Sequence, residues 1–215
     1  MQHDMLIDAR QPLDDLGLDD VARRIIEAAG DRPILLLANP GSGATMIARR
    51  IAKLTTMNPG TAWEATATHR GVGLLRNQDD FRAGDRGPLR APHHTCSDVA
   101  LAGGGKSTFR PGECALAHGG TLFLDEGPEF RRSAMGVVGR AHSEGSIRTV
   151  RSTYSVTTAT RFRLVVQASL CACGGNRNGR HEAGYCDDAA TARYHGRLNS
   201  LWEWTSKPCV VRIDR

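Results

Sequence analysis

Apolar positions along the chain follow two different spacings, and each spacing predicts a type of element. Residues 34–37 form a continuous apolar run between Pro33 and Asn39, which predicts a strand buried on both faces of a parallel sheet. Apolar stripes at helical spacing predict one helix before this strand, ended by Gly30, and another helix after it. The first stripe consists of Val21, Ile25, Ile26 and Ala29, and the second of Met46, Ile47, Ala48, Ile51 and Leu54.

The same alternation continues along the rest of the chain. Residues 121–124 and 162–167 predict two further buried strands, and residues 131–142 predict a helix. The glycine- and proline-rich stretch 83–120 predicts loops or hairpins rather than long helices. Strands that alternate with helices are typical of a parallel sheet, so we expect an α/β fold with flanking helices and inserted β-hairpins. We assign residues 1–30 to a lead-in and a helix, and residues 31–215 to one core domain.

A glycine-rich loop, ANPGSGAT at residues 38–45, joins the first predicted strand to its helix. Its layout is that of a phosphate-binding loop, GxxxxGK[ST], in which backbone N–H groups and the helix N-terminus hold phosphate while lysine neutralises it. Gly43 and Thr45 fit this pattern, but Ala38 replaces the first glycine and Ala44 replaces the lysine. An ordinary strand-turn-helix connection is the alternative. The predicted ATP contacts are Asn39, Pro40, Gly41, Ser42, Gly43, Ala44, Thr45 and Met46.

The predicted strand at residues 121–124 is followed by two acidic residues, Asp125 and Glu126. Open α/β sheets bind ligands at the carboxyl ends of their strands. Asp125 is therefore predicted to hold Mg²⁺ together with Thr45, and Glu126 to orient an attacking water, so these two acids are the predicted catalytic residues. A solvated turn or a helix cap is the alternative. The phosphate-loop pattern earlier in the chain favours the first interpretation.

A second glycine-rich segment, GGGKST at residues 103–108, contains the Gly-Lys-Ser triplet that the first loop lacks. Ala100 stands where a leading glycine belongs, and no long apolar run precedes the segment. Pro111 and Gly112 would interrupt a following helix. We therefore do not expect this segment to be the phosphate loop, although Lys106 can approach a phosphate from it.

Composition and charge limit the class of protein. The chain has 215 residues, of which 40% are hydrophobic, and this suffices for one well-packed core. The N-terminal residues are acidic and form no apolar signal segment, so we expect a cytoplasmic protein without a membrane partner. The net charge of +5 is concentrated in arginines of residues 131–163. These arginines predict either contact with nucleic acid or a solvated or subunit-contact surface.

Longer blocks of sequence carry a family resemblance. The runs RGPLRAPHHTCSDVALAGGG and RPGECALAHGGTLFLDEGPEF, at residues 86–105 and 110–130, resemble the magnesium-chelatase-like AAA+ ATPases, and within them the ComM (YifB) group most closely. The resemblance covers most of residues 20–200. It implies an AAA+ core of the P-loop NTPase type, ATP and Mg²⁺ bound between subunits, and a ring that is usually hexameric. DNA is an implied partner, since ComM-like members are helicases that promote branch migration.

The chain departs from this family at positions that support ATP hydrolysis. Besides Ala38 and Ala44, Ser169 replaces the asparagine expected at sensor 1, and the arginine finger falls on Thr205 without a gap or on Arg212 with one. The family's helical lid is largely absent from the sequence. The resemblance therefore implies an ATP-binding domain that is poor at hydrolysis or lacks it. An active ring ATPase that acts on DNA and a nucleotide-free pseudo-ATPase that acts as an assembly partner are the alternatives.

Six cysteines in a chain without an export signal predict free thiols or metal ligands rather than disulfides. Cys171, Cys173 and Cys186 cluster in the sequence with His181 between them, and the ComM group has a similar CPCG run followed by further cysteines. Three thiolates and one imidazole suit a tetrahedral zinc site. Free thiols on a loop are the alternative, because Cys171 and Cys173 are closer in sequence than the cysteines of a usual zinc knuckle.

Two further groups of residues are expected to have structural roles. The four histidines His69, His93, His94 and His118 are assigned to structural or loop-positioning roles. His93 and His94 are expected to face opposite sides of an extended segment, so they would not hold one metal ion together. Trp202 and Trp204 are spaced for one face of a strand, which predicts burial or a subunit contact.

Overall fold

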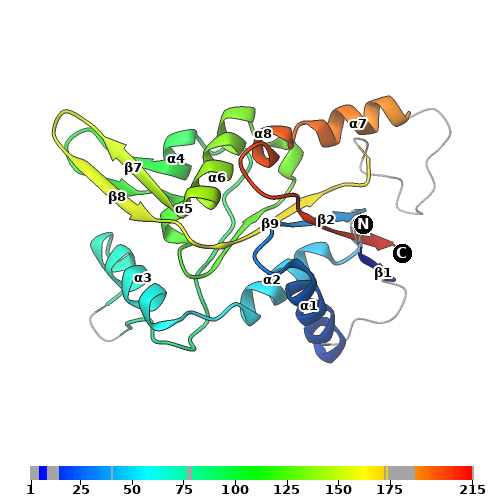
Figure 1. Ribbon diagram of the computed structural model, residues 1–215, viewed down its shortest axis with the longest axis horizontal. Coiled ribbons are helices and arrows are strands. Elements are labelled where there is room, and N and C mark those ends of the chain that lie inside the picture. The colour runs from blue at the N-terminus through cyan, green and yellow to red at the C-terminus, as the bar shows by residue number, and fades with distance from the viewer. Residues whose placement is uncertain are drawn as a thin grey trace.

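Six parallel strands form the central sheet of the computed structural model, which describes residues 5–8, 15–39, 41–76, 79–171, 173 and 187–214 (Figure 1). Every pair of neighbouring strands in this sheet is parallel. In spatial order the strands are β1 (Met5–Asp8), β10 (Cys209–Asp214), β2 (Ile34–Ala38), β9 (Arg163–Ala168), β6 (Thr121–Leu124) and β3 (Leu89–Arg90). The three strands predicted from apolar runs are the adjacent strands β2, β9 and β6. The expected parallel α/β sheet is confirmed.

Helices cover both faces of this sheet (Figure 1). One face carries α1 (Asp15–Ala29) and α2 (Ala44–Leu54). The opposite face carries α4 (Asp98–Ala102), α5 (Glu113–Leu116), α6 (Arg132–Glu144), α7 (Asp188–Gly196) and α8 (Asn199–Trp202). The helix α3 (Pro59–Gly71) and the 3-10 turn η1 (Gly127–Glu129) complete the helical elements of the described residues. None of the helices in this part of the chain is both long and apolar enough to span a membrane.

Successive residues of the central strands point into two different hydrophobic cores. Ile34 and Leu36 of β2 pack with the core under α1 and α2, whereas Leu35 between them packs with the core under α6 and α8. Likewise, Val165 of β9 belongs to the first core and Leu164 to the second. Because both faces of these strands are buried, their sequences are continuously apolar rather than alternating.

The predicted helices occur with small shifts of their ends. Gly30 follows the last residue of α1 and has a φ of 55°, a left-handed conformation that ends the helix, as predicted. The helix predicted at residues 131–142 is α6. Residues 5–8 of the predicted lead-in form the edge strand β1. The strand predicted from Trp202 and Trp204 is wrong, because residues 199–202 wind into α8 so that Leu201 can pack beside α6.

Two antiparallel hairpins are inserted between the elements of the sheet, as expected. The first pairs β4 (Gly103–Gly104) with β5 (Arg110–Pro111), and the second pairs β7 (Ser146–Val150) with β8 (Ser155–Ala159). The Tyr154 hydroxyl donates a hydrogen bond to the Gly105 carbonyl at 2.8 Å and thereby joins the hairpin tips. The GGGKST segment therefore forms β4 and the following turn rather than a phosphate loop.

A close approach of two backbone segments holds β3 beside the start of β6. The backbone N–H of Thr121 donates to the Pro88 carbonyl at 2.9 Å. A Cβ added at Gly120 would lie 2.0 Å from that same carbonyl oxygen, so no larger residue fits there. The glycine thus lets the residues before β3 lie against the residues that lead into β6.

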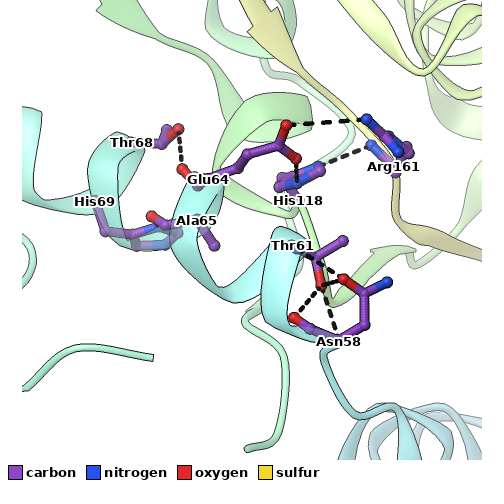
Figure 2. A network of polar contacts seen from close by, with 8 residues as sticks. All are labelled: Asn58, Thr61, Glu64, Ala65, Thr68, His69, His118 and Arg161. Atoms are coloured by element: carbon purple, nitrogen blue, oxygen red, sulfur yellow. Dashed lines mark hydrogen bonds and ion pairs between the residues drawn. The ribbon is translucent and has the colours of Figure 1, made fainter. Parts of the chain in front are cut away.

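A polar network centred on the buried His118 joins α3 to the residues just before β6 and β9 (Figure 2). The His118 side chain has no exposed surface, and its Nε2 lies 2.8 Å from Glu64 Oε2. Its Nδ1 accepts a hydrogen bond from the Arg161 backbone N–H at 3.0 Å, so the ring proton belongs on Nε2. Burial lowers the pKa of His118, partly offset by Glu64. His118 is therefore a neutral structural histidine, in line with the expected role.

Candidate functional site

The carboxyl ends of three adjacent strands meet at one cavity of about 390 Å³. Because β2, β9 and β6 are parallel neighbours, the residues after each strand lie at the same edge of the sheet. The cavity is lined by Asn39, Gly41, Ser42, Gly43, Ala44, Thr45, Met46, Asp125, Glu126, Gln167 and Ser169. It thus brings together residues 39 and 41–45 of the glycine-rich loop, the acidic pair and Ser169. Pro40 lies outside the described residues.

The glycine-rich loop presents an uncapped helix end to this cavity. Gly41 and Gly43 have φ values of 80° and 90°, which favour glycine, and no atom lies within 4 Å of a Cβ built at either position. Gly43 is the N-cap residue of α2, and no side chain caps the helix. Its first turn also contains no acidic residue. The first N–H groups of α2 therefore remain available to an anion, as does the positive end of its dipole.

Two buried oxygens in the loop lack partners. Ser42 is 4% exposed, and neither its hydroxyl nor the side-chain carbonyl of Asn39 has a hydrogen-bond partner among the described residues. Leaving such groups unpaired costs about 1–3 kcal/mol each. A phosphate oxygen in the cavity would accept from the Ser42 hydroxyl, whereas the Asn39 carbonyl oxygen needs a donor such as a water or a ligand hydroxyl. The loop therefore fits a phosphate-bearing ligand, although the methyl group of Ala44 supplies none of the positive charge of a lysine.

Oxygen ligands for a hard cation face the same cavity. Thr45 and Asp125 both line it, and hydroxyl and carboxylate oxygens are ligands that Mg²⁺ accepts. Burial raises the pKa of Asp125, a backbone hydrogen bond from Glu126 opposes this, and the nearby charge of Arg49 also lowers it. The site residues thus fit the predicted magnesium ion.

Glu126 has an unusual backbone held by a neighbouring strand. Its φ of 53° and ψ of 47° are left-handed, and it is the one non-glycine residue with positive φ in the described part of the chain. Such a conformation costs about 1–3 kcal/mol and often occurs at functional sites. The Glu126 N–H donates to Gln167 Oε1 at 3.1 Å, which fixes this turn. Gln167 was not identified from the sequence, where it reads as one more residue of an apolar strand.

The Glu126 carboxylate lies beside a histidine from another loop. Its Oε2 is 3.3 Å from His94 Nδ1, and the His94 ring packs edge-on to Phe130. The expectation that His93 and His94 face opposite sides is wrong, because the chain turns at His94 and the two ring centroids lie 4.1 Å apart. The assigned positioning role of His94 agrees with its contact to Glu126.

Ser169 connects the cavity to α7. Its carbonyl oxygen lies 2.9 Å from His195 Nε2. Burial raises the pKa of Tyr194, while hydrogen bonds to Ser169 oppose the shift. Ser169 therefore links the end of β9 to two residues of the RYHGRL segment.

Two groups of predicted site residues lie apart from the cavity or are not brought together: the arginine finger candidate Arg212 and the predicted zinc ligands. Arg212 is an exposed residue in the middle of β10, paired with Leu37, and does not line the cavity. The thiols of Cys171 and Cys173 lie 2.9 Å apart, but His181 and Cys186 lie outside the described residues. Within the described ranges, no three potential metal ligands of the His, Cys, Asp or Glu type come together. The predicted zinc site therefore has no support here.

A second cavity, of about 770 Å³, shares Thr45, Asp125 and Glu126 with the first. Its other walls include basic side chains from α2 and from the loops around β3. These are Arg49, Lys53, Arg86, His93 and His94. These basic residues could not be placed in one site from the sequence, since nothing in their spacing indicates that the β3 loop faces α2.

Comparisons with known proteins agree on one family. Residues 13–214 match the family model described as magnesium chelatase, subunit ChlI. YifB of Escherichia coli K12 is 35% identical over 215 residues, which are 100% of this chain and 38% of YifB. Competence protein ComM of Haemophilus influenzae is 39% identical over 140 residues, 65% of this chain and 27% of ComM. The chain spans roughly a third of the length of these curated relatives.

A more distant likeness is found among solved structures. The crystal structure of NtrX from Brucella abortus in complex with ADP aligns with a TM-score of 0.47 and 18% identity. The alignment covers 91% of this chain and 34% of that chain. A likeness this distant carries no argument about the ligands of this protein.

Proposed function

The chain belongs to the magnesium chelatase subunit ChlI family, and on this premise we propose that it is an AAA+ domain that binds ATP with Mg²⁺ but hydrolyses it poorly or not at all alone. Residues 31–215 would form the ATPase core, to which residues 1–30 add an edge strand and a helix. The observation that carries the proposal is the uncapped start of α2, which faces the same cavity as Thr45 and Asp125.

In the proposed complex the chain binds phosphate mainly through its backbone. The N–H groups at the start of α2 and the Ser42 hydroxyl donate to phosphate oxygens, while Thr45 and Asp125 hold the metal. When bound, Mg²⁺ neutralises charge on the terminal phosphates. Glu126 is the acceptor that orients a water, and its contact with His94 competes with that role.

Weak hydrolysis follows from the charges that the cavity lacks. A phosphate-loop lysine and an arginine finger both stabilise charge that develops in the transition state, and a finger alone contributes about 10³–10⁵ in rate. Ala44 supplies no charge, and Arg212 does not line the cavity of its own chain. We propose that the chain assembles into a cytoplasmic oligomeric ring, in which exposed Arg212 acts on the nucleotide of a neighbouring subunit.

Equilibrium binding of a fluorescent ATP analogue tests this proposal. The protein is expected to bind the analogue at micromolar concentrations with Mg²⁺ and more weakly with excess EDTA. Asp125→Asn is expected to weaken the Mg²⁺-dependent binding about tenfold, because one metal-ligand charge is lost. Asp79→Asn, at an exposed position away from the cavity, is the matched control. No saturable binding under either condition would point instead to a nucleotide-free assembly partner.

Action on DNA is a second candidate function, favoured by the joined hairpins. Residues 103–112 and 145–161 contain no acidic residue. Their exposed cations are Lys106, Arg110, Arg148, Arg151 and Arg161. The Phe109 and Tyr154 rings pack edge-on between the hairpins, with centroids 5.8 Å apart. A cationic surface with hydroxyl and aromatic side chains suits a nucleic acid backbone and its bases.

Replacing Arg148 and Arg151 together with glutamine is expected to weaken single-stranded DNA binding about tenfold at low salt. Losing two phosphate contacts should also lower the slope of log affinity against log salt by about 1.4. Fluorescence anisotropy of a labelled oligonucleotide over a salt series measures both quantities. The control replaces Arg23 and Arg24 on α1, which lies away from the β7–β8 hairpin (Figure 1). Equal losses in both double variants would reject a hairpin-specific contact.

A further inference from the structure

We infer that Arg49 supplies the positive charge at the terminal phosphate that Ala44 does not provide. This inference rests on the proposed nucleotide site and assigns a phosphate-binding residue that lies outside the phosphate-loop pattern.

The position of Arg49 on α2 directs its side chain toward Thr45 and Asp125, the proposed metal ligands. Arg49 follows Thr45 by four residues, so the two lie on the same face of the helix about 6 Å apart along its axis. Side chains of a helix point toward its N-terminus, which for Arg49 is the end that carries the glycine-rich loop. Arg49 and Thr45 accordingly line the same cavity with Asp125 and Glu126.

The guanidinium of Arg49 is not engaged elsewhere. Its side chain is exposed and has no ion pair or hydrogen bond with any residue that the structure describes. Its neighbour Arg50, in contrast, has its Nε 3.1 Å from Asp19 Oδ1. Because the Arg49 guanidinium has no ion pair or hydrogen bond within the described residues, it can bind phosphate without first breaking such a contact.

The other cations of the second cavity are less well placed. Lys53 lies one helical turn beyond Arg49, about 12 Å along the axis from Thr45. Arg86 enters the cavity from the loop before β3 rather than from α2. Arg49 is thus the cation nearest the loop along α2, and its planar fork can bind two phosphate oxygens at once.

Arg49 lies at the end of the site that carries Asp125 and Glu126, and this position predicts a preference for ATP over ADP. Asp125 and Glu126 mark the end of a P-loop site where the metal and the terminal phosphate lie. A charge at this end interacts with the third phosphate of ATP more than with the two phosphates of ADP. Arg49 therefore contributes to discrimination between ATP and ADP, whereas the loop amides hold both nucleotides.

Binding of fluorescent ATP and ADP analogues to Arg49→Gln and Lys53→Gln tests the inference. Arg49→Gln is expected to bind the ATP analogue about tenfold more weakly and the ADP analogue within about twofold of the parent. Lys53→Gln is expected to stay within about twofold for both analogues. The double change Ala44→Lys with Arg49→Gln should restore ATP binding to at least the parent level. Thermal melts should be unchanged in Arg49→Gln, since the side chain has no protein partner to lose.

The outcomes separate this inference from the proposed function. Failure of the parent chain to bind either analogue would reject the proposed nucleotide site itself. Binding by the parent together with an unchanged Arg49→Gln would reject only the role of Arg49. Equal weakening by Arg49→Gln and Lys53→Gln would also overturn it, because the effect would then belong to the general charge of the cavity. Absence of rescue by Ala44→Lys would show that the two positions do not supply the same charge.

Discussion

Ala44→Lys is expected to tighten the binding of ATP with Mg²⁺ by about one to two orders of magnitude. The new ammonium would start at the first residue of α2, beside the loop amides, and add a charge-assisted hydrogen bond to phosphate. Such a bond contributes about 1.5–3 kcal/mol. Titration with a fluorescent ATP analogue measures the change directly.

The control for this gain is a lysine placed outside the loop. Leu74→Lys adds the same charge at a side chain that is 53% exposed and lines neither cavity. It should increase affinity only slightly, because solvent screens an exposed charge. If Ala44→Lys and Leu74→Lys bound ATP equally well, or neither exceeded the parent chain, the loop would not be the phosphate site. A gain specific to Ala44→Lys would show that the glycine-rich loop still binds phosphate although the lysine position of the pattern holds alanine.

His118→Ala is expected to lower the free energy of unfolding by about 2–4 kcal/mol. The change removes the hydrogen bond to the Glu64 carboxylate and leaves the partly buried Arg161 N–H without its acceptor (Figure 2). It also leaves a cavity where a fully buried ring was packed. Urea denaturation at pH 8 measures the loss. His93→Ala is the control, since its exposed ring bonds only locally to Thr95 and its removal should cost less than about 0.5 kcal/mol.

The pH dependence of this loss tests the protonation state of His118. Burial lowers the pKa of His118 in the folded protein below its ordinary value of 6.5. The unfolded chain therefore binds a proton first as the pH falls, and the stability of the parent decreases below about pH 6.5. Because the alanine variant lacks this group, the difference between parent and variant should shrink from pH 8 to pH 5.5. A difference that grows instead would indicate a charged His118 paired with Glu64.

The parts of the fold that were predictable are those whose burial leaves a simple signal. β2, β6 and β9 are buried on both faces, so their sequences are uninterrupted apolar runs. The helix α3 escaped prediction because its buried positions, Ala62, Ala65 and His69, are small or polar, while Trp63 is 75% exposed. Its apolar side chains therefore do not mark its buried face.

The residues of the candidate site likewise fall into those that a local sequence pattern marks and those that only the fold brings together. The glycine-rich loop and the acidic pair are contiguous motifs, so their residues could be proposed from spacing alone. Gln167, Arg49 and His94 join the site because β9 lies between β2 and β6 and because the loop after β3 faces α2. Strand order and loop placement of this kind are set by the whole sheet, and no local pattern encodes them.

The polar network of Figure 2 lies where the β7–β8 hairpin passes into β9, and this position makes it a mechanical joint. Three residues separate the end of β8 from the start of β9, and two of them are anchored. Thr160 Oγ1 donates to the Ala141 carbonyl at 2.6 Å, and the Arg161 N–H donates to His118. We therefore expect Thr160 and Arg161 to resist a displacement of the hairpin before it reaches β9. This joint thus lies between the hairpin and the cavity at the carboxyl ends of β2, β9 and β6.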